Sequence, residues 1–396
     1  MKLHALIVGI CCLAAQRGFS EDLTLCSEPK SAMQWKGRAG AWMANVDSDA
    51  FDSREKLAAK IVALKEMGVT EIYPVVWNKG TLLFRAPELQ ARWGQSSFYK
   101  EQWKNRDILA EVVEEAKSHG MKVYAWFESG LKIPAGMDIQ KKHPEWFLKN
   151  LAGGVSSVEG HVPLARLNPA RPEVRQLYAD MFRYVVDHYG VDGVQVDDHF
   201  SLSREWGYDA ATLAQYRRDT GLTPPRSIPP INTPASSSLF VPWRPWMQWK
   251  ANRVTELMGD IVTAVRTSKN MKFQISPHPH PWTVNVLAQD WTEWMKRGWV
   301  DEVIAQVYRE GDSNYSFELR NPGFVGAKKC VPILIGVYAG QKNRIMPTEK
   351  VLWQIGIARD FAFEGVAFFN AETLFNGNES AEERTRKIGE ALNAKP

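Results

Sequence analysis

Eight short runs rich in β-branched and aromatic residues recur along the chain, and helical segments fill the intervals between them. The predicted strands cover 37–46, 71–77, 122–129, 193–198, 272–278, 302–308, 331–340 and 364–372. Strands that alternate with helices form parallel β-α units, and eight such units close into a barrel. The runs are apolar almost throughout, as strands covered on both faces are. The sequence therefore predicts an α/β fold, a (β/α)8 TIM barrel.

Four of the intervals show the spacing of apolar residues that is typical of an amphipathic helix, and each ends at a glycine. These predicted helices cover 53–68, 106–120, 171–190 and 347–365. An open, doubly wound sheet is the main alternative to a barrel. It is disfavoured because no glycine-rich phosphate-binding turn follows an early strand.

The first 20 residues resemble a secretory signal peptide, because Lys2 precedes an apolar run from Leu3 to Ala15 and small residues follow. That run is too short to cross a bilayer, and no later segment is long and apolar enough to do so. We therefore expect export to the periplasm or the exterior after cleavage. An uncleaved tether is one alternative. A lipid-modified cysteine is another, although Ile10 stands where a small residue should precede it.

Residues 21–396 are interpreted as one (β/α)8 domain, since no segment between the strands has the composition of a domain linker. Without the signal peptide, two cysteines remain, Cys26 and Cys330. A disulfide between them and a pair of free thiols are both open. The net charge of +4 is too small, for 396 residues, to indicate a nucleic-acid partner.

The connections after the second, third and fourth strands are much longer than the rest. The extra residues are 79–104, 130–166 and 199–250, all at the carboxyl ends of strands, where barrel enzymes carry their active sites. Seven of the 16 tryptophans lie in these insertions. We expect about half of the inserted aromatic side chains to pack internally and the others to suit the flat faces of sugars.

Alternation along a strand decides which side chains share a face. Asp197 shares the predicted inward face of its strand with Gln195, whereas Asp198 begins the following loop. Glycoside hydrolysis needs a protonated acid and a second carboxylate that acts as nucleophile or base. Crowded acids raise one another's pKa, which supplies the protonated partner. The acids expected on one rim are Glu128, Asp197, Asp198, Glu310 and Glu372.

Histidines near these acids raise the alternative of a metal site. His199 follows the two aspartates, and His278 and His280 follow the fifth strand. Such a set could hold a divalent cation, as in a deacetylase. The absence of a His-x-x-x-His pair and the prolines around His278 argue against it. We predict no metal or other cofactor, and expect His199 and His278 to bind substrate hydroxyls or to orient carboxylates.

Several long motifs, in order, are similar to those of one protein family: "AWMANVDS", "YPVVWNKGTLLF", "KVYAWFESGL", "YGVDGVQVDDHF", "ISPHPHPW" and "EGVAFFNAETLF". From about Arg38 to Phe375 the chain resembles the glycosyl-hydrolase-like 10 family. The resemblance implies an exported barrel glycosidase, of a family that includes enzymes acting on bacterial cell-wall glycan. It places the catalytic centre at Glu128, Asp197 and Asp198, and it implies that the cleft is lined by Trp77, Asn78, His199, Gln306, Tyr308 and Arg309.

The leading hypothesis is a glycoside hydrolase that cleaves a polysaccharide, with peptidoglycan strands as the candidate substrate. Glu128 is predicted to be the general acid and Asp197 the nucleophile or base, with Asp198 as an orienting neighbour or the alternate in that role. His278 and Glu372 join the predicted substrate-binding residues. Two other classes stay open: a non-catalytic carbohydrate-binding barrel and a metal-dependent polysaccharide deacetylase.

Overall fold

The computed structural model describes residues 23–29, 33–231, 233, 236–309, 311–341, 344–376 and 379–394. The predicted signal peptide at 1–20 lies outside these residues, as does Glu310. None of the helices in the described part of the chain has the length and apolar character that crossing a bilayer requires.

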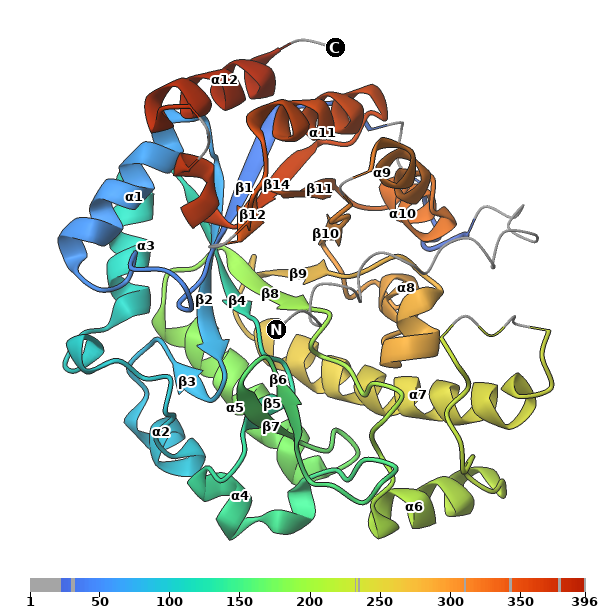
Figure 1. Cartoon of the computed structure of the whole chain (residues 1–396). Helices are drawn as coiled ribbons and strands as arrows, with labels where there is room; N and C mark the ends of the chain where they lie inside the picture. Colours follow the sequence, from blue (N-terminus) through green and yellow to red (C-terminus); the bar gives the residue numbers. More distant parts are fainter. Residues whose placement is uncertain are drawn as a thin grey trace.

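Eight parallel strands form a closed barrel (Figure 1). Each strand pairs with the next in chain order, and β1 pairs with both β2 and β14, which closes the sheet. This confirms the predicted TIM barrel, and every predicted strand overlaps an observed one. The barrel strands are β1 (Arg38–Met43), β2 (Glu71–Asn78), β4 (Lys122–Phe127), β8 (Gly193–Asp197), β9 (Lys272–Ser276), β10 (Glu302–Gln306), β11 (Ile333–Tyr338) and β14 (Gly365–Phe369).

Helices surround the barrel, and the four that the sequence predicted are present. They are α1 (Arg54–Glu66), α3 (Ile108–Ser118), α5 (Pro172–His188) and α11 (Thr348–Asp360). Ser53 caps α1, because its side chain accepts a hydrogen bond from the backbone N–H of Lys56. The other helices of this layer are α7 (Phe240–Val265), α8 (Trp291–Lys296), α9 (Asp312–Leu319), α10 (Pro322–Lys328) and α12 (Ala381–Asn393).

The long connections form their own small elements. After β2 come β3 (Thr81–Leu82), α2 (Pro87–Trp93) and η1 (Glu101–Trp103). After β4 come α4 (Asp138–Lys142), η2 (Pro144–Trp146) and an antiparallel sheet, and after β8 comes α6 (Ala210–Thr220). The sheet contains β5 (Lys132–Pro134), β7 (Val162–Arg166) and β6 (Ser157–Glu159), in that order. Short elements also follow later strands: η3 (Thr283–Leu287), β12 (Gly340–Gln341), β13 (Arg344–Ile345) and η4 (Ala371–Phe375).

Most of the inserted tryptophans are buried, so the expectation that about half would be free for sugars is wrong. Of the seven, Trp146 alone is half-buried, and the rest are at most 4% exposed. Trp246 stacks on Trp249 with ring centroids 5.5 Å apart, for example. Large connections need apolar cores of their own, and these rings supply them.

The barrel interior is polar at its amino-terminal end. Arg38 of β1 forms ion pairs with Glu71, at 2.5 Å, and with Glu302. One layer further along, Gln195 accepts a hydrogen bond of 2.6 Å from the Trp42 indole N–H. Gln195 therefore points inward, as strand alternation predicts.

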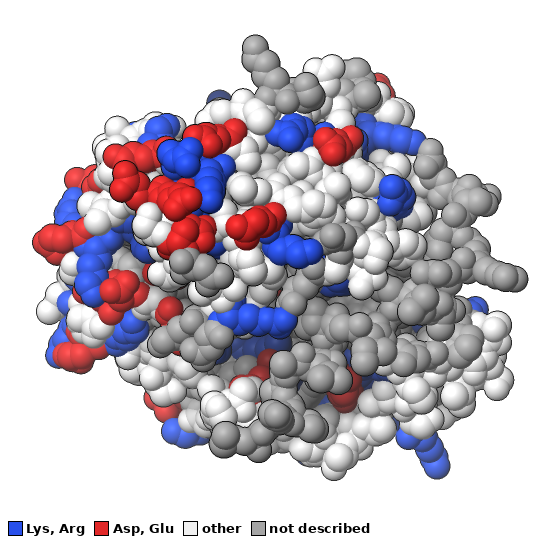
Figure 2. Space-filling model, turned by 45° about the horizontal axis from the view of Figure 1, so that its top comes forward, with Lys and Arg blue, Asp and Glu red and all other residues white. Residues whose placement is uncertain are grey.

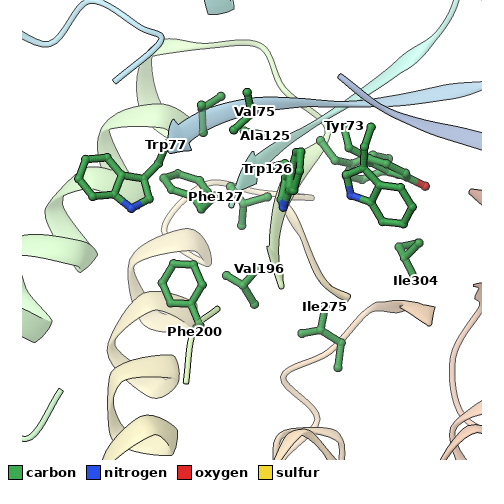
Figure 3. Close-up of a cluster of buried hydrophobic side chains, with 14 of the residues drawn as sticks. Tyr73, Val75, Trp77, Ala125, Trp126, Phe127, Val196, Phe200, Ile275 and Ile304 are labelled. Carbon is green, nitrogen blue, oxygen red and sulfur yellow. The ribbon is translucent and has the colours of Figure 1, made fainter. Parts of the chain in front are cut away.

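The opposite faces of the strands pack against helices. The ring of Phe127 stacks on Phe182 of α5, with centroids 3.7 Å apart. Figure 3 shows Phe127, Val196 and Phe200 in this buried layer, with Trp126 on the other side of β4.

A disulfide joins Cys26 to Cys330, so of the two alternatives for these cysteines the structure contains the bonded one. It attaches the amino-terminal segment, including the buried Leu25, to the end of α10. Elsewhere on the surface, charges of both signs are mixed. Figure 2 shows lysines, arginines and acidic residues interspersed on the side where α1 lies in Figure 1, which agrees with the small net charge.

Candidate active site

Four predicted site residues meet where two neighbouring strands end. Glu128 directly follows β4, Asp197 is the last residue of β8, and Asp198 and His199 begin the next loop. The strands are paired in parallel with Phe127 beside Val196, so both chains emerge at the same mouth of the barrel. Glu128 lies close enough to Asp197 and His199 for their charges to shift its pKa.

Gly130 allows the two loops to approach each other closely. Its φ is +51°, and a Cβ atom added there would lie 2.1 Å from the carbonyl oxygen of His199. The Gly130 carbonyl accepts hydrogen bonds from the Trp77 indole, at 3.1 Å, and from the Tyr178 hydroxyl, at 2.6 Å. A larger residue would push the Glu128 loop away from His199.

Glu128 is half-buried, and one carboxyl oxygen accepts a 2.6 Å hydrogen bond from the Asn78 side-chain amide. Burial raises the pKa of Glu128 to about 7, and the charge of Asp197 adds to this shift. The positive charges of His199 and Lys79 act in the opposite direction. A large fraction of the molecules therefore carries a protonated Glu128 near neutral pH.

Asp197 is 4% exposed, and both of its carboxyl oxygens accept hydrogen bonds. The Trp126 indole N–H donates to one oxygen at 3.1 Å, and the backbone N–H of His199 donates to the other at 2.9 Å. The imidazole Nδ1 of His199 lies 3.1 Å from each oxygen. Burial raises the pKa of Asp197, although its contacts with His199 oppose the shift.

Asp198 is more accessible than Asp197, since its side chain is 18% exposed. The Gln306 side-chain amide donates to Oδ1 at 2.9 Å, and Nε2 of His278 lies 3.6 Å from Oδ2. Burial acts to raise the pKa of Asp198. The positive charge of His199 and the contacts with His278 and Gln306 outweigh it and hold that pKa well below its usual range. Asp198 is therefore ionised.

His199 supplies a positive charge between the two aspartates. Burial acts to lower its pKa, but the charges of Asp197 and Asp198 raise the pKa to about 9. Asp197, Asp198 and His199 also have potential ligand atoms within 4.8 Å of one another, a spacing at which they could hold a metal ion. A protonated imidazole offers no lone pair to a metal. A metal ion at this place would therefore require His199 to lose its proton.

Three other predicted residues support the cluster. Asn78 is 1% exposed and positions Glu128 through its amide, while its own oxygen accepts from Ser129. Gln306 is 8% exposed and holds Asp198. Burial raises the pKa of Tyr308, and the charges of the nearby Asp198 and Asp197 raise it further.

The prediction that Trp77 lines a cleft is not supported. Its side chain is fully buried, with its ring centroid 4.4 Å from that of Trp93 and 6.4 Å from that of Tyr178. The register between β2 and β4 shifts between Val75 and Trp77, which breaks the alternation of faces. Trp77 therefore packs beneath the loops, as Figure 3 shows at the end of β2.

Glu372 and Arg309 form ion pairs outside the cluster. Glu372 pairs with Lys60 of α1 at 3.2 Å and accepts from the Ser48 hydroxyl at 2.7 Å. It lies in η4, beyond the end of β14, where strand alternation no longer applies. Arg309 pairs with Glu318 of α9 at 3.0 Å. Neither placement matches the predicted contact with substrate at the acids.

Two supporting residues were not singled out from the sequence. Trp126 donates to Asp197, and its position on the same strand face as Glu128 is a signal that could have identified it. The Gln289 amide donates to the backbone carbonyls of Asp197, at 2.9 Å, and Phe200, at 3.2 Å. It precedes α8 in a loop, and no local pattern indicates this role.

The chain is similar in sequence to known glycosyl hydrolases. The profile described as glycosyl hydrolase-like 10 matches residues 38–354. The glycosyl hydrolase YngK of Bacillus subtilis (strain 168) is 23% identical over 227 residues, which cover 51% of this chain and 39% of YngK. The glycosyl hydrolase DigH of Escherichia coli (strain K12) is 25% identical over 219 residues, which cover 48% of this chain and 47% of DigH. The chain thus spans less than half the length of these curated relatives.

Two solved structures share the fold. The PgaB (BpsB) glycoside hydrolase domain from Bordetella bronchiseptica has a TM-score of 0.61 at 14% identity, covering 90% of this chain and 99% of that domain. The catalytic domain of β-amylase from Paenibacillus polymyxa has a TM-score of 0.59 at 14% identity, covering 92% of this chain and all (100%) of that domain. At this level of identity the likeness establishes the architecture alone.

Proposed function

The chain belongs to the glycosyl hydrolase-like 10 family, and on that premise we propose that it is a glycoside hydrolase that cleaves a polysaccharide with two carboxyl groups. One observation carries the proposal: the acids at one mouth of the barrel have pKa values shifted in opposite directions. Glu128 has a pKa of about 7, whereas Asp198 is held ionised. A protonated acid and an ionised carboxylate at one mouth of the barrel are the combination that glycoside hydrolysis requires.

In this mechanism Glu128 protonates the oxygen of the leaving sugar. Asp198 is the better candidate for the second carboxylate, because it is ionised and more accessible than Asp197. Asp197 accepts hydrogen bonds at both oxygens and holds His199 in place. The protonated His199 keeps Asp198 ionised and so maintains the difference between the two reacting groups.

We further propose that the enzyme is exported and that its substrate is the glycan strand of peptidoglycan. The disulfide between Cys26 and Cys330 supports export, since such bonds persist in oxidising compartments. The family resemblance supports a cell-wall glycan. Lys79, whose charge acts on Glu128, is suited to a substrate that carries carboxylates.

The test is the release of reducing ends from peptidoglycan glycan strands by Glu128→Gln and Asp198→Asn. General acid–base and nucleophilic groups contribute about 10²- to 10⁴-fold each, so both variants should lose at least about 100-fold in rate. Glu372→Gln is the matched control, because Glu372 is ion-paired with Lys60 outside the cluster; it should retain activity. Parent-like rates in both cluster variants would overturn the mechanism, and binding of strands by an inactive parent would favour a carbohydrate-binding barrel.

A metal-dependent deacetylase is the second candidate, and the spacing of Asp197, Asp198 and His199 is the observation in its favour. It requires His199 to lose its proton and bind the ion. Acetate release that chelation abolishes and zinc restores would replace the two-carboxylate mechanism by this one.

A further inference from the structure

A hollow of about 490 Å³ lies in the insertion that follows β2. We call it the Tyr99 hollow. Its wall is formed by residues 82–87 and 103–106, together with Gln90, Gln95, Tyr99, Glu101 and Ile108. None of Glu128, Asp197 and Asp198 is part of this wall, so the hollow is distinct from the acid cluster. Its volume falls in the range of binding sites for small molecules.

The wall combines aromatic rings with amides. The rings of Tyr99 and Trp103 stand almost perpendicular, with centroids 6.0 Å apart, and Tyr99 is half-buried. The exposed side chains of Gln90 and Gln95 are joined by a 3.1 Å hydrogen bond and retain further donor and acceptor capacity. A ring face for C–H groups and amides for hydroxyls are the two requirements for holding a sugar.

One side of the Tyr99 hollow is fixed to α5 and the residue that follows it. The backbone N–H of Arg85 donates to the Tyr189 hydroxyl at 3.1 Å, and its carbonyl accepts from the Tyr184 hydroxyl at 2.8 Å. The ring of Phe84 stacks on Tyr184 with centroids 5.9 Å apart. A wall that is already ordered loses little conformational entropy when it binds a ligand.

A smaller neighbouring hollow has part of its wall in common with the Tyr99 hollow. The two share Gln90, Gln95 and Tyr99, and the smaller one is also lined by Gly80 and Ser96. The Ser96 hydroxyl donates to the Lys79 carbonyl at 2.5 Å, and the backbone N–H of Lys79 donates to the Ser129 hydroxyl at 2.7 Å.

The next two hydrogen bonds complete the connection. Ser129 donates to Asn78, and Asn78 donates to Glu128 at 2.6 Å. The wall of the hollows and the proposed general acid therefore belong to one hydrogen-bonded chain. The hollows therefore border the segment that holds Asn78 and, through it, Glu128.

We propose that the Tyr99 hollow is a binding subsite for sugar residues of the polysaccharide that lie beyond the bond to be cleaved. The inference rests on the proposed function, since it takes the occupant to be part of the same substrate. A subsite in the Tyr99 hollow makes the affinity for an oligosaccharide depend on the length of that oligosaccharide. Short oligosaccharides fill only the acid cluster, whereas longer ones also contact Tyr99 and the amides.

The test compares Tyr99→Ala, Gln95→Ala and the ring-retaining Tyr99→Phe. Phe361→Ala is the matched control, because Phe361 is also partly buried and follows α11 before β14, at the opposite end of the barrel. Binding is measured in a Glu128→Gln background, so that no cleavage occurs. The probes are β-1,4-linked N-acetylglucosamine oligomers of increasing length and soluble peptidoglycan glycan strands. Hydrolysis is measured separately in the active background, and thermal unfolding confirms that each variant is folded.

Tyr99→Ala should weaken the binding of the longest probes about tenfold, as stacking of one ring is worth roughly 1–1.5 kcal/mol. It should leave the binding of the shortest oligomers and the kcat on them unchanged. Gln95→Ala should have the same sign of effect, and Tyr99→Phe and Phe361→Ala should match the parent. Equal losses for short and long probes, no loss for either, or no binding of any probe by the parent would overturn the subsite. Length-dependent binding that Tyr99→Ala weakens, without hydrolysis by the parent, would uphold the subsite and overturn the proposed function instead.

Discussion

The charge on single residues decides what the acid cluster can do. Glu128 has to give up a proton, so the reaction needs its protonated form, and Asp198 has to be ionised. Since the pKa of Glu128 is about 7 and that of Asp198 lies well below its usual range, both conditions hold on the acidic side of neutrality. We expect kcat/KM to decline as the pH rises above about 7.

Lys79 gives a way to test the origin of that decline. Its positive charge lowers the pKa of Glu128, so Lys79→Met should move the basic limb of the pH–rate profile to higher pH. The measurement is kcat/KM from pH 5 to 9 on one glycan probe. Lys56→Met is the control, because Lys56 is paired with Asp49 at 2.7 Å on the surface near α1 and should leave the limb in place. An unshifted limb in Lys79→Met would show that another group controls it.

Residue-scale prediction from sequence succeeded where a side chain belongs to a regular strand. Asp197 and Gln195 follow the alternation of β8, and Glu128 continues that of β4 for one residue. Glu372 lies in η4 beyond the strand and pairs with Lys60, and Trp77, which the family resemblance placed in the cleft, is buried where the register shifts. The division of roles between Asp197 and Asp198 depends on contacts from Trp126, His278 and Gln306, which come from other strands and loops. Spacing along one segment does not contain that information.

At the scale of elements, α7 holds the loop that follows the acids. Lys250 is fully buried in this helix, and its ammonium group donates to the backbone carbonyls of Ser203, at 2.8 Å, and Trp206, at 3.0 Å. Burial lowers the pKa of Lys250 to about 7. Burial of the Lys250 amine costs free energy, and its hydrogen bonds hold the loop that begins at Asp198.

Removal of this anchor should loosen the loop. Lys250→Met leaves two buried carbonyls without a donor, so the free energy of unfolding should fall by about 2–4 kcal/mol, and the rate on glycan should fall as well. Urea unfolding and reducing-end release measure the two effects. The exposed Lys269→Met serves as the control and should change neither. Full activity and stability in Lys250→Met would show that the loop is held by other contacts.

The elements themselves were the most predictable level of organisation. Strands that are buried on both faces, such as β11 and β14, appear in the sequence as apolar runs of the right length. The inserted segments were recognised as insertions, and about half of their aromatic side chains were expected to pack internally. Their small sheet and the burial of nearly all their tryptophans were not foreseen. Their rings are buried by contacts within the insertions, as Trp246 with Trp249 shows, and composition alone does not reveal whether a ring faces inward.

At the scale of the whole molecule, the disulfide connects parts of the chain 304 residues apart. Closing so long a loop removes conformational entropy from the unfolded chain, which stabilises the fold by about 2–4 kcal/mol in typical cases. Replacement of both Cys26 and Cys330 by Ser should therefore lower the free energy of unfolding by that amount. Urea unfolding of the two proteins measures it, and a reductant should destabilise only the parent. A reductant effect of equal size on both proteins would contradict this account.

The closure of the barrel has a consequence for how the chain is made. Strand β1 is held on one side by β14, with Arg38 beside Gly365. The pairing of β1 with β14 therefore requires the last strand to be present, and contacts between residues so distant in sequence form slowly. During synthesis the growing chain has an open sheet with two bare edges, and it becomes a finished barrel only when its final strand has left the ribosome.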